Sequence, residues 1–341
     1  EAVGSYAISQ GTLSAGSNYD LTFVSKDFSI TKKSLAIAAE NKSKEYDGTV
    51  YIGFTVTYSG FISGEDESDL SGTLAYSGTA TTATNVGTGY AITPGGLTSS
   101  NYAITFAAGS LDITQKSITV TADAGQTKVY GDADPTYTYT ASASLETGDS
   151  FSGALSRATG EDVGSYAIGQ GTLSAGSNYD LTFVSKDFSI TQKAITVTAD
   201  AGQTKVYGDA DPTYTYTASA SLETGDSFSG ALSRATGENV GSYAIGQGTL
   251  SAGSNYDLTF VSKDFSITQK SITVTADADQ TKVYGDADPT FTYTTSSTLE
   301  TGDSFSGALS RATGENVGSY AIGQGTLSAG SNYTLTFVSK D

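Results

Sequence analysis

One stretch of thirteen residues recurs along the chain at a fixed spacing. The sequence KVYGDADPTYTYT begins at Lys128 and at Lys205, and it returns at Lys282 with Phe291 in place of a tyrosine. The copies lie 77 residues apart, a period longer than that of helical solenoid repeats and close to the size of a small domain. The repeat therefore predicts a string of similar modules rather than one large hydrophobic core.

The same period sets the module boundaries. Two nearly identical copies differ only at Ser117/Ala194 and Asp162/Asn239. A more distant copy precedes them, with KEYDGT in place of KVYGDA, and the chain begins and stops inside a copy, so we expect a slice through a longer array. The predicted segments are the second half of a module (1–32), a distant module (33–115), two full modules (116–192 and 193–269) and a module that lacks its last strand (270–341).

Composition restricts how such modules fold and what they bind. The 341 residues include 40 glycines and 4 prolines but no cysteine, methionine, tryptophan or histidine, so the modules must fold without disulfides, on apolar burial and sheet hydrogen bonds. No apolar run approaches the roughly 20 residues that span a bilayer. The net charge of −19 repels phosphate groups and anionic lipids. We therefore expect neither nucleic acid nor membrane among the partners.

Short alternating runs of apolar and polar residues predict β-strands almost throughout. Ile118 and Val120 alternate with threonines, as do Tyr137 and Tyr139, and Gly, Asn and Asp interrupt the runs. This pattern predicts an all-β chain, and we expect a tandem array of small modules that are immunoglobulin-like β-sandwiches or, as the alternative, β-grasp-like. The expected core of the first full module consists of Ile118, Val120, Tyr137, Leu155, Tyr166, Leu181, Phe183, Phe188 and Ile190.

The junctions between modules contain no spacer. Apolar positions are even-numbered at Phe188 and Ile190 but odd-numbered at Ile195 and Val197, so the buried face changes within about four residues. No Gly/Ser-rich or Pro-rich linker separates the two runs. Because short junctions restrict rotation between neighbours, we predict an elongated, stiff rod of beads.

The motifs resemble a known domain family. The sequences KVYGDADP, GDSFSG, VGSYAI and NYDLTF closely resemble the MBG domain of the YGX type, and KEYDGT with NYAITF in residues 33–115 resembles the related YDG domain. The likeness covers essentially the whole chain. It implies tandem domains of a large bacterial secreted or surface protein, as in filamentous-haemagglutinin-like adhesins. It carries over no catalytic residue, and it leaves both an immunoglobulin-like β-sandwich and a β-grasp-like module open.

An acidic turn follows the tyrosine of each YGX motif. Asp132 and Asp134 flank one alanine, and Asp123 lies upstream, so three carboxylates could converge on a hard cation such as Ca²⁺. The pattern matches neither an EF-hand loop nor a calcium β-roll. The alternative is that the aspartates shape the turn, with Pro135 fixing the backbone. The candidate calcium ligands are Asp123, Asp132, Asp134, Asp200, Asp209, Asp211, Asp277, Asp286 and Asp288.

Other repeated residues have both a chemical and a structural interpretation. Glu146 and Asp149 have the residue types of a glycosidase pair, but a small repeated bead offers no substrate cleft, so we expect no enzyme and a solvated turn. The 22 tyrosines could stack on sugars, although most alternate in phase with core residues. Lys128 and its equivalents could form a crosslink to Asp or Asn. Arg157 should make a surface ion pair of small value.

Together these features predict a structural repeat region of a bacterial extracellular adhesin or surface fibre, acting as a stiff stalk or filament. The alternative is an array of weak glycan- or calcium-binding modules that contributes to adhesion and biofilm matrix through avidity. The expected partners are neighbouring modules of a longer chain, other copies in a fibre, and host or matrix glycans. No cofactor is expected apart from possible Ca²⁺, and the expected location is extracellular, at the bacterial cell surface or secreted.

Overall fold

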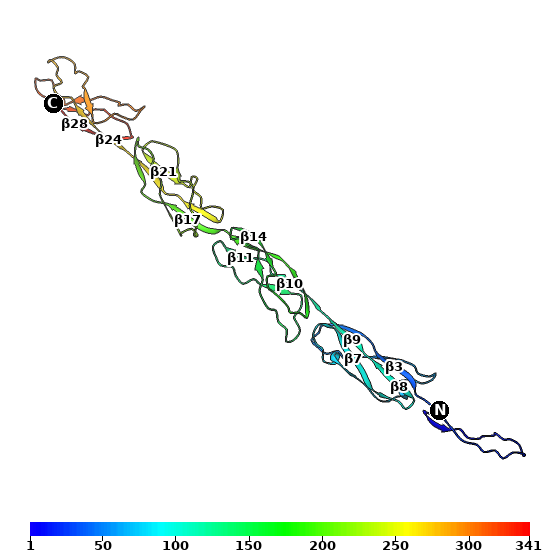
Figure 1. The fold of residues 1–341 in the computed structure, drawn as a ribbon. Coiled ribbons are helices and arrows are strands. Elements are labelled where there is room, and N and C mark those ends of the chain that lie inside the picture. The colour runs from blue at the N-terminus through cyan, green and yellow to red at the C-terminus, as the bar shows by residue number, and fades with distance from the viewer. The chain divides into compact units, whose positions relative to one another are not determined.

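The computed structural model describes residues 1–341, and β-strands form almost all of the regular structure (Figure 1). There is no α-helix, and the only helical turns are the short 3-10 turns η1 (Glu67–Asp69) and η2 (Thr79–Thr81). This confirms the all-β prediction. No helix has the length and apolar character needed to cross a membrane.

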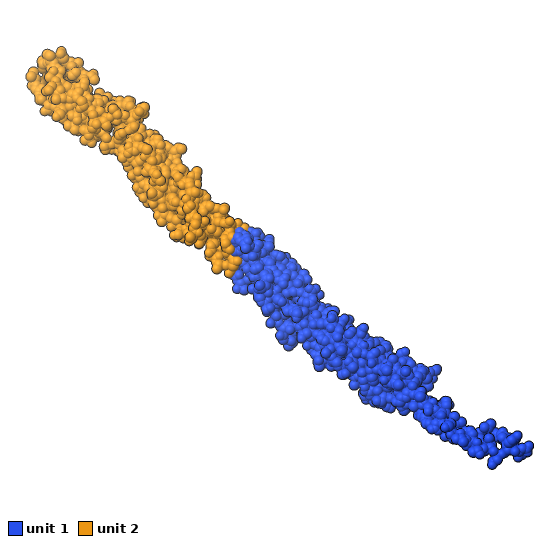
Figure 2. Space-filling model, in the orientation of Figure 1, with its two compact units in different colours: residues 1–126, 135–160, 165–188 blue, residues 127–134, 161–164, 189–341 orange.

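The chain divides into two compact units, which are coloured separately in Figure 2. Unit 1 consists of residues 1–126, 135–160 and 165–188, and unit 2 consists of residues 127–134, 161–164 and 189–341. One complete module lies in each unit, residues 33–115 in unit 1 and residues 193–269 in unit 2. The two complete modules have the same arrangement of strands.

The complete module of unit 1 is built from the strands β3 (Lys33–Ala39), β4 (Lys42–Glu45), β5 (Val56–Ser59), β6 (Ser71–Ser77), β7 (Gly87–Thr98), β8 (Tyr102–Ala107) and β9 (Gly109–Thr114). They form two mixed sheets. The first has the order β5-β3-β8, in which β3 runs antiparallel to β5 and parallel to β8. The second has the order β4-β9-β7-β6, in which β4 and β9 are parallel and the other pairs antiparallel.

The complete module of unit 2 is built from the strands β17 (Lys193–Ala199), β18 (Thr204–Val206), β19 (Tyr216–Ala218), β20 (Ser233–Arg234), β21 (Gly241–Gly246), β22 (Tyr256–Val261) and β23 (Asp264–Thr268). Its sheets have the orders β19-β17-β22 and β18-β23-β21-β20. Here too the first strand pairs in parallel with the sixth, β17 with β22. The last strand, β23, pairs in parallel with β18.

Both sheets of the unit 2 module contribute to one core, as in a β-sandwich. Val197 and Ala199 of β17 belong to the same buried cluster as Phe265 and Ile267 of β23. In β17 the buried residues alternate with threonines, because successive side chains of a strand point to opposite faces. No α-helix packs on either sheet, as it would in a β-grasp module. The structure therefore supports the β-sandwich prediction over its alternative.

The other segments repeat parts of this module. Residues 116–192 and 270–341 contain the same three-stranded sheet, with the orders β12-β10-β15 and β25-β24-β28, whereas the N-terminal segment is a β1-β2 hairpin. The strands of these segments are β1 (Gly4–Ala7), β2 (Asp27–Ile30), β10 (Lys116–Ala122), β11 (Gln126–Val129), β12 (Tyr139–Ala141), β13 (Ser156–Arg157), β14 (Gly164–Gly169), β15 (Tyr179–Val184), β16 (Lys186–Thr191), β24 (Lys270–Ala276), β25 (Tyr293–Thr295), β26 (Ser310–Arg311), β27 (Ile322–Gly323) and β28 (Tyr333–Val338).

Five of the nine predicted core residues are buried and four are half-buried. Ile118, Val120, Leu155, Phe188 and Ile190 are all buried. The other four predicted core residues, Tyr137, Tyr166, Leu181 and Phe183, are half-buried. Tyr179 is 4% exposed, although it was not part of the predicted core.

The junctions are as short as the sequence predicts. β9 ends at Thr114 and β10 begins at Lys116, and the same single-residue gap separates β16 from β17 and β23 from β24. The residue in each gap is a glutamine, Gln115, Gln192 or Gln269. A strand of one module thus continues almost directly into the first strand of the next module.

Candidate functional site: the joint between modules

The glutamine between two modules is fixed to the module that follows it. The side-chain amide of Gln192 donates hydrogen bonds to the backbone carbonyls of Ser254 and Tyr256, both at 3.0 Å. The backbone N–H of Lys193 donates to the carbonyl of Asn255 at 3.0 Å. Equivalent bonds are made by Gln115 and Gln269. The connecting residue is therefore an ordered part of the fold and not a flexible link.

The tyrosine of each YGX motif leaves its own module and contacts the next one. Tyr207 donates a hydrogen bond to Oδ2 of Asp303 at 2.9 Å, and Tyr333 donates to the same oxygen at 2.7 Å. The two tyrosine rings meet edge to face, with their centroids 5.5 Å apart. Tyr333 also accepts a hydrogen bond from the backbone N–H of Glu300 at 2.7 Å. One carboxylate thus holds two aromatic side chains, each from a different module.

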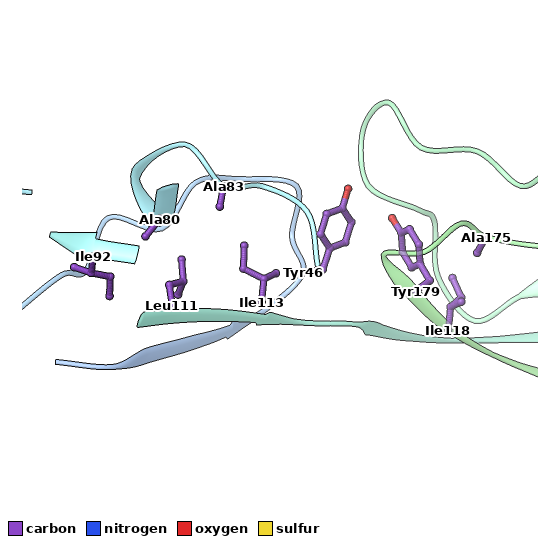
Figure 3. Packing of buried hydrophobic residues seen from close by; sticks show 9 residues of the cluster. All are labelled: Tyr46, Ala80, Ala83, Ile92, Leu111, Ile113, Ile118, Ala175 and Tyr179. Atoms are coloured by element: carbon purple, nitrogen blue, oxygen red, sulfur yellow. The ribbon is translucent and has the colours of Figure 1, made fainter. Parts of the chain in front are cut away.

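The same three residues recur at two further junctions. In unit 2, Tyr130 and Tyr256 both donate to Oδ2 of Asp226. In unit 1, Tyr46 and Tyr179 both donate to Oδ2 of Asp149. Figure 3 shows these two rings next to each other within a row of buried apolar residues, with Ile113 on the side of Tyr46 and Ile118 on the side of Tyr179. We call each set the tyrosine joint: Tyr46–Asp149–Tyr179, Tyr130–Asp226–Tyr256 and Tyr207–Asp303–Tyr333.

The tyrosine joint depends on protonated phenols, because each hydroxyl group donates a hydrogen bond to the aspartate. The hydrogen bond to Asp149, together with burial, raises the pKa of Tyr46 to about 12. Burial, with the hydrogen bond to Asp303, raises the pKa of Tyr333 to about 12. A phenolate in either position would face the carboxylate as a second anion. The two phenols therefore keep their protons over the whole neutral range of pH.

The glycine of the YGX motif makes room for a side chain of the next module. Gly208 has φ +88°, and a Cβ atom placed there would lie 2.5 Å from Cδ of Glu300. Gly131 has the same relation to Glu223. Each glutamate forms an ion pair with the lysine that begins its module, Lys270 or Lys193. The motif therefore combines a tyrosine that reaches the next module with a glycine that lets it approach.

A third contact closes the other side of the joint. Asn255 accepts a hydrogen bond from the backbone N–H of Val163 at 2.9 Å, and its amide donates to Asp162 at 2.9 Å. Asn332 bonds Val240 and Asn239 in the same way. Since each asparagine lies one module further along than its partners, the joint is held on two sides.

The sequence predicted that the repeated ETGD stretch is a solvated turn, and the structure shows that this is wrong. Its aspartate accepts the two tyrosines of the joint, and its glutamate pairs with the lysine at the start of the module. Asp149 and Glu146 are both partly buried. The two carboxylates of this motif therefore already have partners within the protein.

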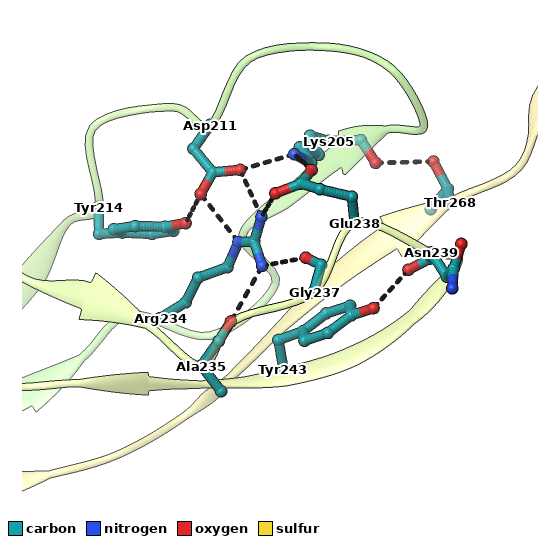
Figure 4. A network of polar contacts seen from close by, with 10 residues as sticks. All are labelled: Lys205, Asp211, Tyr214, Arg234, Ala235, Gly237, Glu238, Asn239, Tyr243 and Thr268. Carbon is teal, nitrogen blue, oxygen red and sulfur yellow. Dashed lines mark hydrogen bonds and ion pairs between the residues drawn. The ribbon is translucent and has the colours of Figure 1, made fainter. Parts of the chain in front are cut away.

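The acidic turn of the YGX motif belongs to a network of four charges (Figure 4). Asp211 contacts Nζ of Lys205 at 2.8 Å and Nε of Arg234 at 2.8 Å. Glu238 pairs with the same lysine and with Nη2 of Arg234. The side chains of Lys205 and Arg234 are only 4% and 5% exposed. We call these residues the charge cluster.

The charge cluster corrects the prediction for the arginine and bears on the predicted lysine crosslink. Arg234, the equivalent of Arg157 one repeat further along, does not form a weak surface ion pair, because its side chain is buried and its guanidinium carbon lies 5.0 Å from the ring centroid of Tyr243. Lys205 and Asp211 have the proximity that an amide crosslink requires. However, hydrogen bonding to Arg234 holds the pKa of Asp211 well below its usual range. Burial would lower the pKa of Lys205, but the hydrogen bonds that Lys205 makes to Asp211 and Glu238 outweigh burial and raise it. This charge state favours an ion pair.

The nine candidate calcium ligands do not converge in groups. Asp134, Asp211 and Asp288 pair with lysines, and Asp123 and Asp200 accept hydrogen bonds from threonine hydroxyls. The backbone N–H groups of Asp132, Asp209 and Asp286 donate hydrogen bonds that close the turn. The backbone N–H of Asp277 donates to the carbonyl of Thr292. The structure contains no group of three or more acidic residues placed to hold a metal ion. Calcium binding stays a prediction.

The tyrosine joint was not predicted, although its parts were visible as motifs. Tyr130 and Asp226 lie 96 positions apart, which is one repeat more than the distance from Tyr130 to Asp149. Sequence alone does not show which of the two equivalent aspartates the tyrosine contacts. The available signal was that a tyrosine followed by glycine or aspartate occurs at this place in every copy.

Comparison with known proteins gives one family. The model of the MBG domain (YGX type) matches residues 35–112, 118–189, 195–266 and 272–341. The first match covers the segment whose KEYDGT motif resembles the YDG type, so the YGX model describes this segment as well. No curated protein matches the chain.

Proposed function

The chain belongs to the family of MBG domains of the YGX type, four of which follow one another over residues 35–341, and we propose that it is a structural repeat region of a bacterial extracellular adhesin or surface fibre. Such tandem domains are typical of bacterial surface proteins. In this role the modules act as a stiff stalk that keeps a more specialised part of the protein away from the cell.

The observation that carries this proposal is the tyrosine joint. It recurs at three successive junctions with the same donors and acceptor, and only a single ordered glutamine connects the strands on either side. A chain whose modules had to move independently would gain nothing from such contacts. The recurrence of this contact between partly or fully buried tyrosines and a partly buried carboxylate supports a function that depends on fixed orientation between neighbours.

The topology of the module supports a mechanical role. A pull along the chain acts on the first strand of a module, β17, and on its last strand, β23. Each of them lies inside its sheet and is paired in parallel with an edge strand, β22 or β18. Sliding parallel strands past each other requires many hydrogen bonds to break together. This arrangement suits a protein that carries tension.

Small-angle X-ray scattering of the whole chain tests the proposal. One variant carries four Gly-Ser residues inserted between Gln192 and Lys193, where they separate the modules. A matched control carries the same insertion after Gly202, in an exposed turn with no neighbour within 4 Å of a Cβ atom. We expect only the junction insertion to broaden the distribution of intramolecular distances. If both variants scatter like the original chain, the joints do not fix orientation and the stalk proposal fails.

A further inference from the structure

Tyrosine is the side chain of this protein that is oxidised most readily. The sequence has 22 tyrosines but no cysteine, methionine, tryptophan or histidine. Cysteine and methionine are common targets of biological oxidants, and they are oxidised before tyrosine. In a chain without them, the electrons that an oxidant removes come from the phenol groups. The positions of the tyrosines therefore decide what oxidation does to this protein.

Two of these phenols lie side by side at each of the three tyrosine joints. The ring centroids of Tyr46 and Tyr179 are 5.5 Å apart, and the ring planes meet at 76°. The two joints of unit 2 have the same centroid distance of 5.5 Å, with angles of 76° and 78°. Other ring contacts, such as that of Tyr139 with Phe151, pair a tyrosine with a phenylalanine, which has no phenol to oxidise. The joints thus bring two oxidisable rings together.

The shared carboxylate provides a base for the proton that an oxidised phenol must lose. A phenol that gives up one electron becomes a strong acid and releases its hydroxyl proton. Oδ2 of Asp149 lies 2.7 Å from the hydroxyl oxygen of Tyr46 and 2.8 Å from that of Tyr179. These distances are within the reach that a general base needs for proton transfer. Both phenols of the joint can therefore lose an electron and a proton without a rearrangement.

The surroundings of the joint admit a small oxidant and leave the radicals little else to react with. Tyr256 belongs to a buried apolar cluster with Ile195 and Ala252, and Tyr130 packs against this cluster. Tyr256 is 4% exposed, whereas Tyr130 is half-buried. An oxidant can therefore approach Tyr130 from the solvent, and the radical that forms there is already in contact with the ring of Tyr256.

We propose that the tyrosine joint is a site of oxidative cross-linking, at which the two tyrosines of consecutive modules become joined as dityrosine. A one-electron oxidant, such as a peroxidase acting with hydrogen peroxide, removes one electron from each phenol, and each hydroxyl proton passes through the aspartate to water. The two phenoxyl radicals then form one carbon–carbon bond between ring carbons ortho to the hydroxyl groups. The hydrogens on these two carbons move to the oxygens, which restores both hydroxyl groups. The pair has lost two hydrogens, and one hydrogen peroxide has been reduced to two waters.

The new bonds would connect the modules covalently beside the glutamine that already links them. The bond from Tyr130 to Tyr256 and the bond from Tyr207 to Tyr333 would enclose overlapping parts of the chain, because Tyr207 precedes Tyr256. A module under tension could then not extend all of its residues. This would strengthen a stalk, but the inference needs only the geometry of the joint and not the stalk function.

Oxidation of the whole chain followed by peptide mapping tests the inference. The probe is persulfate with a light-activated ruthenium complex, a small one-electron oxidant, applied at low protein concentration so that links between chains are rare. Trypsin places Tyr46 in residues 45–116 and Tyr179 in residues 158–186, two peptides of unique sequence. In the fraction with the mass of one chain, we expect mass spectrometry to find these two peptides joined, with the loss of two hydrogens. The other two joints should give the equivalent products.

Three variants separate the roles within the first joint. Tyr46→Phe keeps the ring but has no hydroxyl group to oxidise, so the joined peptide should disappear. Tyr166→Phe is the matched control, since Tyr166 lies in the same tryptic peptide as Tyr179 while its ring lies beside Arg157, and it should leave the yield unchanged. Asp149→Asn removes the base and should lower the yield severalfold. In the original chain, oxidation in concentrated urea should abolish the preference for this pair.

Two results would overturn the inference. One is an oxidised chain whose cross-links do not include the pair Tyr46 and Tyr179, and the other is a yield of joined peptide that persists in Tyr46→Phe. An unchanged yield in Asp149→Asn would overturn the role of the carboxylate as the base. None of these results affects the stalk proposal, which the scattering of the insertion variants tests separately.

Discussion

Tyr46 and Tyr179 belong to consecutive modules, and their hydroxyl groups donate to the same oxygen of Asp149 at 2.7 and 2.8 Å. Their rings meet edge to face at 5.5 Å. This relationship connects the motif that defines the repeat to the contact between repeats, because Tyr46 lies in the motif while Tyr179 and Asp149 lie in the module that follows.

The variant Tyr46→Phe should weaken the first joint without disturbing either module. It removes one hydrogen bond to a charged acceptor, which we expect to cost about 1–2 kcal/mol of the free energy of unfolding of the joint. Native-state hydrogen exchange at Tyr46, Glu146 and Tyr179 measures the effect. The control Tyr90→Phe removes a hydroxyl that bonds only the exposed carbonyl of Asn85, and equal effects from the two variants would contradict the role of the joint.

Gly208→Ala should be more destabilising than Gly285→Ala, although both glycines occupy the same place in the repeat with almost the same φ. A left-handed alanine costs about 1–2 kcal/mol at either position. At Gly208 the new methyl group also collides with Glu300, which adds about 1–3 kcal/mol, whereas at Gly285 nothing lies within 4 Å. Urea unfolding of the two variants gives the difference. Identical values would mean that Glu300 moves away without cost.

Lys205→Met should destabilise the module of unit 2 by about 3 kcal/mol, because it leaves Asp211 and Glu238 with Arg234 as the only cation of the cluster. This is the lower end of the range for a broken buried ion pair, since Glu238 is 68% exposed. Chemical denaturation measures the loss. Lys282→Met in the last module is the comparison, and it should cost less because the side chain of Lys282 is 20% exposed. An equal loss would speak against burial as the cause.

Acid should destabilise the modules through the charge cluster. Hydrogen bonding to Arg234 holds the pKa of Asp211 below its usual range, and hydrogen bonding to Lys205 lowers the pKa of Glu238. The unfolded chain therefore binds more protons than the folded chain as the pH falls below about 4, and the free energy of unfolding decreases. Melting temperatures between pH 7 and pH 2 measure this loss. Asp211→Asn should lower the melting temperature at pH 7 and flatten its dependence on pH; an unchanged slope would contradict the assignment.

Alkali should open the tyrosine joints before it unfolds the sheets. An unfolded tyrosine ionises at about pH 10, whereas the pKa of Tyr46 is raised to about 12. Between these values the folded chain keeps protons that the unfolded chain has lost, so the stability from the joint is present below pH 10 and falls as the pH rises. Hydrogen exchange or ultraviolet titration of the phenols follows the change. In Asp149→Asn the tyrosines should titrate at lower pH; titration at the original pH would exclude the carboxylate as the cause.

The period of the repeat and the alternation of apolar and polar residues were sufficient to predict the modules, the strands and the short junctions. These features depend on residues close together in sequence. Gln192, for example, lies between two strands whose apolar residues have opposite parity. The polar contacts were harder to predict. Glu238 meets Lys205 from 33 positions away, and a carboxylate in a turn looks the same in sequence whether water or a buried cation faces it.

The half-buried tyrosines show that alternation in the sequence does not predict how deeply a side chain is buried. Tyr166 alternates with core residues, which made it a core candidate, yet its ring lies beside the guanidinium of Arg157, with the guanidinium carbon 5.0 Å from the ring centroid. Alternation identifies the face of a strand and not the depth of burial. Tyr179 is more deeply buried because it belongs to a buried cluster against which Phe151 and Leu145 pack, and because its hydroxyl group has partners in the joint.

The single glutamine between modules has a consequence for inheritance. Residues 116–192 and 193–269 each contain the aspartate and second tyrosine of one joint and the first tyrosine of the next joint, so removing or duplicating one such unit brings matching residues together again. Residues 116–192 and 193–269 are almost identical, and recombination between genes that encode such copies adds or deletes complete units. A change in length by such a unit would therefore create no junction of a new kind.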